Sequence, residues 1–122
     1  MTDAPGDTAP RLRLRVVFTP GGMLGPGKAD LLALIDETGS ISGAGRRMGM
    51  SYKRAWTLVE TLNTLFSGPL VESSRGGDGG GGARLTETGR EVLARYRALE
   101  RRAADAGAED VAALEALRRR NG

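Results

Sequence analysis

The spacing of apolar residues changes along the chain and predicts a succession of short elements. In residues 11–18 (RLRLRVVF) leucine and valine alternate with arginine, and this period of two predicts a strand with one solvated face. Over residues 26–38 apolar residues instead return every three or four positions, which predicts a helix. Pro26 suits the first turn of that helix, and Gly39 suits its end.

Two helical segments separated by a glycine turn come next. Ser40 caps a short helix over residues 40–48, and Ser51 caps a longer helix over residues 52–66, with Gly49 in the turn between them. Spacings of three and four define the expected inward face of the longer helix. That face consists of Ala55, Leu58, Val59, Leu62 and Leu65.

A hairpin and a long helix are expected in the remaining part of the chain. Short strand-like segments, LVE at 70–72 and ARLT at 83–86, flank the glycine run RGGDGGGG at 75–82, and we expect a hairpin with a mobile tip. Thr86 caps a helix over residues 87–106, and a final helix covers 109–119. The apolar stripe of the long helix consists of Val92, Tyr96, Leu99 and Ala103.

This order of elements is the layout of a winged helix-turn-helix. We therefore expect an α+β, mostly α fold, in which a winged helix-turn-helix precedes a long C-terminal dimerisation helix. The expected organisation is a disordered leader at 1–10, a DNA-binding domain at 11–86, and a helical dimerisation and tail segment at 87–122.

Composition narrows the classes of function. The 122 residues include 18 Lys and Arg against 15 Asp and Glu, but no cysteine and no histidine. The chain therefore lacks the thiolate and imidazole groups that supply most metal sites and general bases, so we expect no cofactor and no enzyme activity. No apolar run approaches the roughly 18 residues of a membrane span. We expect a cytoplasmic protein with no membrane partner.

The charges of the helix-turn-helix segment are of one sign. Between Glu37 and Glu60 every charged residue is basic, and carboxylates that would repel phosphates are absent. Four like charges on a solvated face also arise by chance, so this pattern alone leaves both interpretations open. The four residues are Arg46, Arg47, Lys53 and Arg54.

The start of the longer helix carries the best candidates for base contacts, because a recognition helix touches base edges with its N-terminal residues. Arg54 can contact guanine through two hydrogen bonds, whereas Lys53 suits a phosphate. Ser51 is first a helix cap and second a phosphate contact. Tyr52 suits either DNA or a partly buried position, and Trp56 suits the core.

The glycine run also has two interpretations. A phosphate cradle would need a following Lys-Ser or Lys-Thr pair, which is absent. A wing tip would bring backbone N–H groups close to DNA phosphates, with Arg75 and Arg84 beside it, and a hairpin tip without contacts is the alternative. The candidate DNA contacts are Ser40, Ser42, Arg46, Arg47, Ser51, Tyr52, Lys53, Arg54, Thr57, Arg75, Gly76, Gly77, Gly79, Gly80 and Arg84.

The stripe on the long helix suits either the core or a seam between helices, and an exposed stripe of this kind often pairs with its own copy. We expect a homodimer, with Val92, Tyr96, Leu99 and Ala103 as candidate contacts. A dimer would place two recognition helices on half-sites one turn of DNA apart.

Two segments closely resemble the DNA-binding domain of the ModE family of molybdate-responsive transcription regulators, whose winged helix is related to that of the LysR family. They are residues 39–63 (GSISGAGRRMGMSYKRAWTLVETLN) and 70–93 (LVESSRGGDGGGGARLTETGREVL). The resemblance implies that residues 51–54 begin the recognition helix, that 76–82 form the wing, and that 87–106 help to hold a dimer. The family's C-terminal oxyanion-binding modules have no counterpart in this sequence, so it implies no molybdate binding by this chain.

The prediction is a sequence-specific regulator of transcription that binds double-stranded DNA as a dimer. The resemblance implies molybdenum-related target genes and a separate effector-sensing protein as partner. The alternative is a winged-helix module for protein interaction or RNA binding, because the fold alone does not decide function. The basic recognition helix and the scarcity of aromatic residues for base stacking favour duplex DNA.

Overall fold

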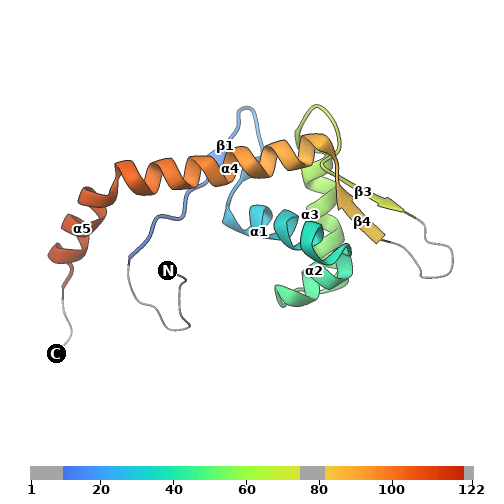
Figure 1. Ribbon diagram of the computed structural model, residues 1–122, viewed down its shortest axis with the longest axis horizontal. Helices are drawn as coiled ribbons and strands as arrows, with labels where there is room; N and C mark the ends of the chain where they lie inside the picture. Colours follow the sequence, from blue (N-terminus) through green and yellow to red (C-terminus); the bar gives the residue numbers. More distant parts are fainter. Residues whose placement is uncertain (1–9, 75–81, 120–122) are drawn as a thin grey trace.

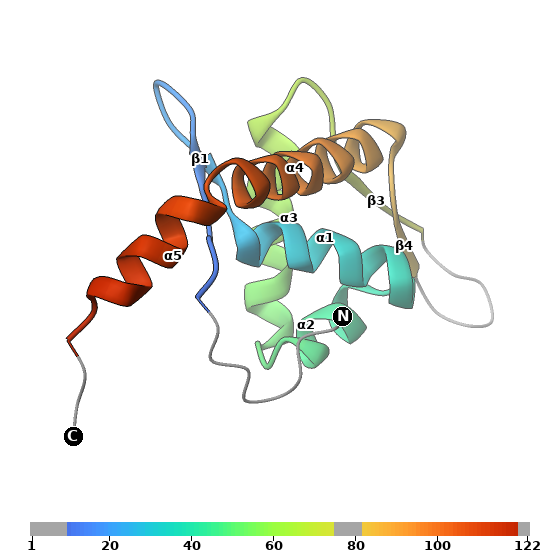
Figure 2. The same ribbon diagram turned by 60° about the vertical axis from the view of Figure 1, so that its left-hand side comes forward.

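The computed structural model describes residues 10–74 and 82–119. Figures 1 and 2 show the first three helices gathered beside one end of the long helix α4, with α5 beyond its other end. The helices are α1 (Pro26–Thr38), α2 (Ile41–Arg47), α3 (Tyr52–Leu65), α4 (Glu87–Ala106) and α5 (Ala108–Leu117). The strands are β1 (Val16–Val17), β2 (Met23–Leu24), β3 (Val71–Ser74) and β4 (Gly82–Leu85). The predicted mostly α winged helix-turn-helix is confirmed.

The N-terminal strand is shorter than predicted. Only Val16 and Val17 pair with β2, in an antiparallel ladder that joins Val16 to Leu24. The partner strand ends at once because Gly25 and Pro26 begin α1, and proline has no N–H to donate to a ladder. The prediction of a strand over the whole of residues 11–18 was therefore wrong except at Val16 and Val17.

Three helices begin at the predicted caps. The Oγ of Ser40 accepts from the N–H of Gly43 at 2.8 Å, and the Oγ of Ser51 accepts from the N–H of Arg54 at 3.1 Å. The Oγ1 of Thr86 accepts from the N–H at position 89 at 2.9 Å. Each cap satisfies a backbone donor that the first helical turn leaves without a partner, which fixes where the helix starts.

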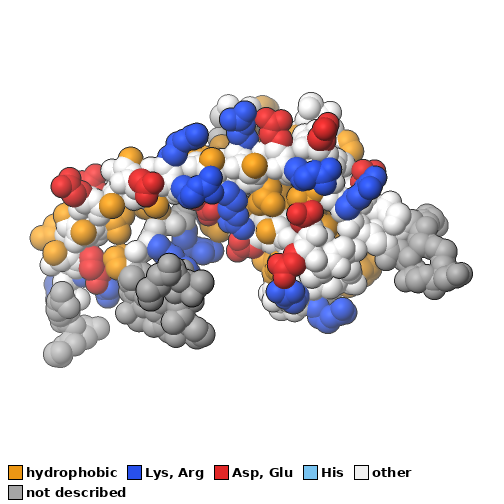
Figure 3. Space-filling view, in the orientation of Figure 1, with side chains coloured by type: hydrophobic (Ala, Val, Ile, Leu, Met, Phe, Trp, Pro, Cys, Tyr) orange, Lys and Arg blue, Asp and Glu red, His pale blue; other side chains and the backbone are white. Residues whose placement is uncertain are grey.

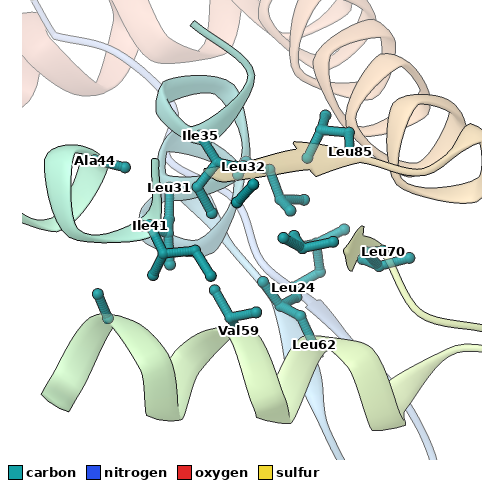
Figure 4. Close-up of a cluster of buried hydrophobic side chains, with 14 of the residues drawn as sticks. Leu24, Leu31, Leu32, Ile35, Ile41, Ala44, Val59, Leu62, Leu70 and Leu85 are labelled. Carbon is teal, nitrogen blue, oxygen red and sulfur yellow. The ribbon is translucent and has the colours of Figure 1, made fainter. Parts of the chain in front are cut away.

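The core lies between α1, α3 and the two wing strands (Figure 4). Of the predicted inward face of α3, Ala55, Val59 and Leu62 are buried, while Leu58 and Leu65 are half-buried. Burying each large aliphatic side chain stabilises the fold by about 1.5–3 kcal/mol. The largest fully buried side chains are Leu31, Leu32, Ile35, Val59, Leu62, Leu70 and Leu85.

Two glycines allow close approaches that set the geometry of the fold. A Cβ at Gly45 would lie 2.8 Å from the Cβ of Ala55, so α2 and α3 cross at a distance that only glycine permits. A Cβ at Gly89 would lie far inside van der Waals contact with the carbonyl of Leu70, so the first turn of α4 is pressed against the chain that leads into β3.

The long helix α4 is tied to the rest of the chain. The guanidinium of Arg97 pairs with Asp30 of α1 at 2.8 Å and with Glu100 at 3.0 Å. The predicted boundary between residues 86 and 87 coincides with the start of α4. The leader predicted for 1–10 lies almost wholly outside the described residues. Within the part of the chain that the structure describes, no helix is long and apolar enough to span a membrane.

Candidate nucleic-acid interface

The helix-turn-helix is formed by α2, a tight turn and α3. Gly49 takes a φ of 73° in that turn, a left-handed conformation that glycine adopts without strain. The N–H of Met50 donates to the carbonyl of Gly45 at 2.9 Å and closes the turn. Since α1 packs against both helices, the start of α3 is held at the end of the molecule away from α4 (Figure 2).

The first two turns of α3 are exposed on the side opposite the core. Lys53 and Thr57 lie across the helix from the buried Ala55 and Val59, because successive residues are rotated by about 100°. The hydroxyl of Thr57 donates to the carbonyl of Lys53 at 2.9 Å, and the side chains of both residues are exposed. The first two turns of α3 therefore present Lys53 and Thr57 on an exposed face.

Tyr52 and Trp56 form an aromatic pair at one side of that surface. Their ring centroids lie 6.1 Å apart with an interplanar angle of 74°, a favoured edge-on arrangement. Tyr52 is 59 % exposed, whereas Trp56 is partly buried against the core, as predicted. The tyrosine ring is thus propped outward, and its hydroxyl is available to a partner.

The candidate basic residues differ in their surroundings. Arg47 pairs with Glu37 at 3.2 Å, and Arg84 pairs with Glu72 at 3.5 Å across the β3–β4 ladder. Both pairs are well exposed, so each contributes little to stability and can be exchanged for a phosphate. Among the described residues no carboxylate pairs with the remaining three, which are Arg46, Lys53 and Arg54.

The serines at the start of α2 are partly buried. The hydroxyls of Ser40 and Ser42 lie 3.2 Å apart, and Ser40 also caps the helix. Capping is therefore the role of Ser40 that the geometry establishes. Ser42, in the first turn of α2, is half-buried.

The wing is described up to its last paired residues. Strands β3 and β4 are antiparallel, with Val71 opposite Leu85 and Ser74 opposite Gly82. The N–H of Ala83 donates to the carbonyl of Gly39 at 2.9 Å, which joins the wing to the end of α1. The other candidates of the wing, Arg75, Gly76, Gly77, Gly79 and Gly80, lie outside the described residues.

Asn63 is a positioning residue that the sequence pattern did not reveal. Its Oδ1 accepts from the N–H groups of Leu70 and Val71 at 2.8 and 3.0 Å, and its Nδ2 donates to the carbonyl of Val71 at 3.1 Å. The side chain therefore locks the end of α3 to the first wing strand. A polar residue at a nearly inward helical position was the only signal of this role in the sequence.

Of the apolar stripe of α4 that was predicted to hold a dimer, some side chains are buried within this chain and others are exposed. Tyr96 is 2 % exposed, and its hydroxyl donates to the carbonyl of Leu14 at 2.6 Å, so it packs within this chain. Burial, the largest cause, raises the pKa of Tyr96 above its ordinary value. Leu99 is 40 % exposed, while Val92 and Ala103 are partly buried.

An open apolar hollow of about 350 Å³ lies next to this stripe. Its walls come from β1, β2, the end of α3 and α4, and they include Phe18, Phe66, Val92 and Leu99. At the far end of the molecule, α5 also has apolar side chains at its surface (Figure 3), and Leu114 and Leu117 are exposed there. Among the described residues no cluster of acidic side chains could hold a metal ion.

Comparison with known proteins places this geometry in a family. Residues 28–90, just over half of the chain, match the family described as "Bacterial regulatory helix-turn-helix protein, lysR family". The chain belongs to the LysR family of helix-turn-helix proteins. The matched segment runs from α1 through both wing strands into the start of α4. The LysR family is one of regulatory proteins, which agrees with the prediction that the chain is not an enzyme.

Individual relatives of this LysR-family chain carry molybdenum-related names, which confirms the resemblance noted in the sequence. It is 43 % identical over 95 residues to "Molybdenum-pterin-binding protein MopB" of Rhodobacter capsulatus, covering 78 % of this chain and 35 % of that protein. It is 50 % identical over 72 residues to "Molybdenum transport protein ModE" of Herbaspirillum seropedicae, covering 59 % and 27 %. With the "DNA-binding transcriptional dual regulator ModE" of Escherichia coli K12 the identity is 42 % over 71 residues, covering 58 % and 27 %. The chain spans between about a quarter and a third of the length of these relatives.

Proposed function

We propose that the chain binds double-stranded DNA in a sequence-specific manner and regulates transcription. The observation that carries the proposal is the exposed start of α3, where Lys53 and Arg54 stand without carboxylate partners among the described residues. A cationic helix end of this kind matches the charge of a phosphate backbone and the width of a major groove.

The geometry of α3 refines the roles expected of its residues. Lys53 and Thr57 lie on the outermost face, so we assign them, with Tyr52, to the groove. Arg54 lies on the flank of the helix, where it faces the beginning of α1. A phosphate contact therefore suits Arg54 better than the guanine contact first expected of it.

Peripheral contacts would come from both sides of α3. Arg46 and Arg47 at the end of α2 and Arg84 on β4 are exposed and suit phosphates. Ser42 and Ser51 are weaker candidates for phosphate contacts, because a hydroxyl near a helix start can bond a phosphate as well as cap the helix. The glycines and Arg75 of the wing tip stay predictions from sequence.

A dimer is the second part of the proposal. The exposed Leu99, the apolar hollow beside it and the exposed leucines of α5 supply a surface that a second copy would cover. Leu99→Glu is expected to shift the light-scattering mass toward that of a monomer, while Arg101→Gln, elsewhere on α4, leaves it unchanged. Equal masses for the unaltered chain and Leu99→Glu would count against this surface.

Target genes are proposed from the relatives alone. Because relatives are named for molybdenum transport and for transcriptional regulation, we propose molybdenum-related genes as targets. A separate effector-sensing protein would then supply any response to a ligand, and the regulator would act in the cytoplasm, where the bacterial chromosome lies.

Fluorescence anisotropy with a labelled random duplex, repeated over a salt series, tests DNA binding, and selection from a random pool then gives the preferred site. We expect a steep salt dependence and a palindrome whose half-sites reflect a two-fold dimer. Lys53→Gln should weaken binding to the selected site, whereas Arg101→Gln, the same charge change on α4, should not. No binding to duplex at low salt, or tighter binding to RNA of the same length, would instead favour the protein-interaction or RNA-binding module.

A further inference from the structure

Three basic side chains from three different elements line one open hollow on the flank of the recognition helix. Arg15 comes from the segment before β1, Lys28 from the first turn of α1, and Arg54 from the first turn of α3. The floor between them is apolar and includes Met48 and Met50 of the helix-turn-helix turn. The hollow has a volume of about 370 Å³.

The positions and surroundings of these three cations suit an anion. The Nζ of Lys28 donates to the carbonyl of Met23 at 3.0 Å, which holds the ammonium in place and leaves two of its N–H groups for a ligand. Arg15 passes over Gly25, where an added Cβ would lie 3.5 Å from the Cγ of Arg15. Within the described ranges no carboxylate pairs with any of the three cations.

The position of the hollow relative to the wing suggests the source of the anion. Asn63 faces the wing strands, and Arg54 precedes it by nine residues. Nine residues are about two and a half helical turns, so the two side chains leave α3 on opposite sides. The hollow therefore lies across the recognition helix from the wing, where the second edge of a major groove would pass.

We propose that Arg15, Lys28 and Arg54 together bind a phosphate of the DNA backbone on the side of α3 opposite the wing. This inference rests on the proposed DNA binding and extends the interface to the segment just before β1 and to the first turn of α1. Arg15 lies outside the segment that matches the LysR family. The methionine floor suits this ligand, because a deoxyribose next to the phosphate presents an apolar edge to it.

The test compares Arg15→Gln and Lys28→Gln with the unaltered chain in anisotropy titrations over a salt series, using both the selected site and a random duplex. Together the two substitutions are expected to lower the slope of log K against log salt by about 0.9, the value for one phosphate, and the affinity by about fivefold to tenfold at 0.1 M salt. Each substitution alone should produce part of this loss. The loss should be equal for both duplexes, since phosphates carry no sequence. Arg15→Lys and Lys28→Arg, which keep the charge, should retain most of the slope.

Arg101→Gln is the matched control and should leave the slope unchanged. If the unaltered chain binds duplex but Arg15→Gln and Lys28→Gln behave like Arg101→Gln, the inference is overturned while the proposed function stands. If the unaltered chain binds no duplex, both are overturned. Saturable binding of inorganic phosphate that needs Arg15 and Lys28, with DNA binding unaffected by either substitution, would overturn the inference in favour of a small-anion site. Ethylation interference compares which DNA phosphates the unaltered chain and the two variants need. The variants should lose interference at a phosphate on the side of α3 opposite the wing. Loss of interference at a phosphate on the wing side would contradict the geometry.

Discussion

Replacing Asn63 by alanine should remove the hydrogen bonds that join the end of the recognition helix α3 to the first wing strand β3. The substitution removes one side chain that accepts two hydrogen bonds, from the N–H groups of Leu70 and Val71, and donates a third to the carbonyl of Val71. Leu70 is fully buried and Val71 is 4 % exposed, so water reaches their backbone groups poorly. Asn63→Ala therefore leaves backbone donors and an acceptor without partners.

The expected cost follows from these three bonds. A hydrogen bond contributes about 1 kcal/mol net, and a buried group left without a partner costs about 1–3 kcal/mol. We expect Asn63→Ala to lower the free energy of unfolding by about 3 kcal/mol, a large share of the roughly 5–15 kcal/mol that stabilises a domain. The melting temperature should fall by about 12 °C.

Urea denaturation followed by circular dichroism measures this loss. Thr64→Ala is the matched control, because the Thr64 hydroxyl is exposed and bonds only to the backbone of its own helix, at Thr61. It should change stability by less than about 0.5 kcal/mol. Asn63→Asp keeps the Oδ1 that accepts both hydrogen bonds and loses the Nδ2 donor, so its cost should be intermediate. A loss under about 1 kcal/mol for Asn63→Ala, or an equal loss for Thr64→Ala, would refute the argument.

Three further substitutions test other contacts. Gly89→Ala should destabilise the chain by about 3 kcal/mol, because the new Cβ meets the backbone of Leu70; an unchanged urea midpoint would contradict this. Tyr96→Phe should cost about 1 kcal/mol through the lost bond to the carbonyl of Leu14. Since the folded-state pKa of Tyr96 is raised, its contribution should persist below about pH 10 and be lost as the pH rises further, and Tyr96→Phe should remove that alkaline dependence, which melting curves at pH 8 to 11 would show. Ser51→Ala should cost about 1 kcal/mol by removing the cap of α3, and thermal melting at neutral pH would reveal an error if the melting temperature did not fall.

Local signals were enough to define the elements of the helix-turn-helix. Ser40, Ser51 and Thr86 marked helix starts because an N-cap acts on donors only two or three residues away. The spacing of Ala55, Val59 and Leu62 marked the buried face of α3 because the period of an α-helix is fixed by its backbone. The order of these elements then sufficed to predict the winged helix-turn-helix.

The pattern of apolar and polar residues could not predict contacts between residues far apart in the chain. Tyr96 and Leu99 belong to the same apolar stripe of α4, but in the fold Tyr96 is buried and Leu99 is exposed. The hydroxyl of Tyr96 donates to the carbonyl of Leu14, which lies 82 positions away in the chain. The N-terminal strand was overestimated because its length depends on a partner strand that Pro26 ends early. A period shows which residues share a face, but only packing decides what that face meets.

The sequence by itself determined the helices, their caps, the turn and the basic character of the helix-turn-helix, since these depend on neighbours within a few positions. The tertiary structure decided which of the basic residues stand together. Arg15, Lys28 and Arg54 are far apart in the chain and line one hollow only because α1 packs across α3. Likewise, Asn63 meets Leu70 and Val71 only because the wing returns beside the helix, since burial of the shared core brings these segments together.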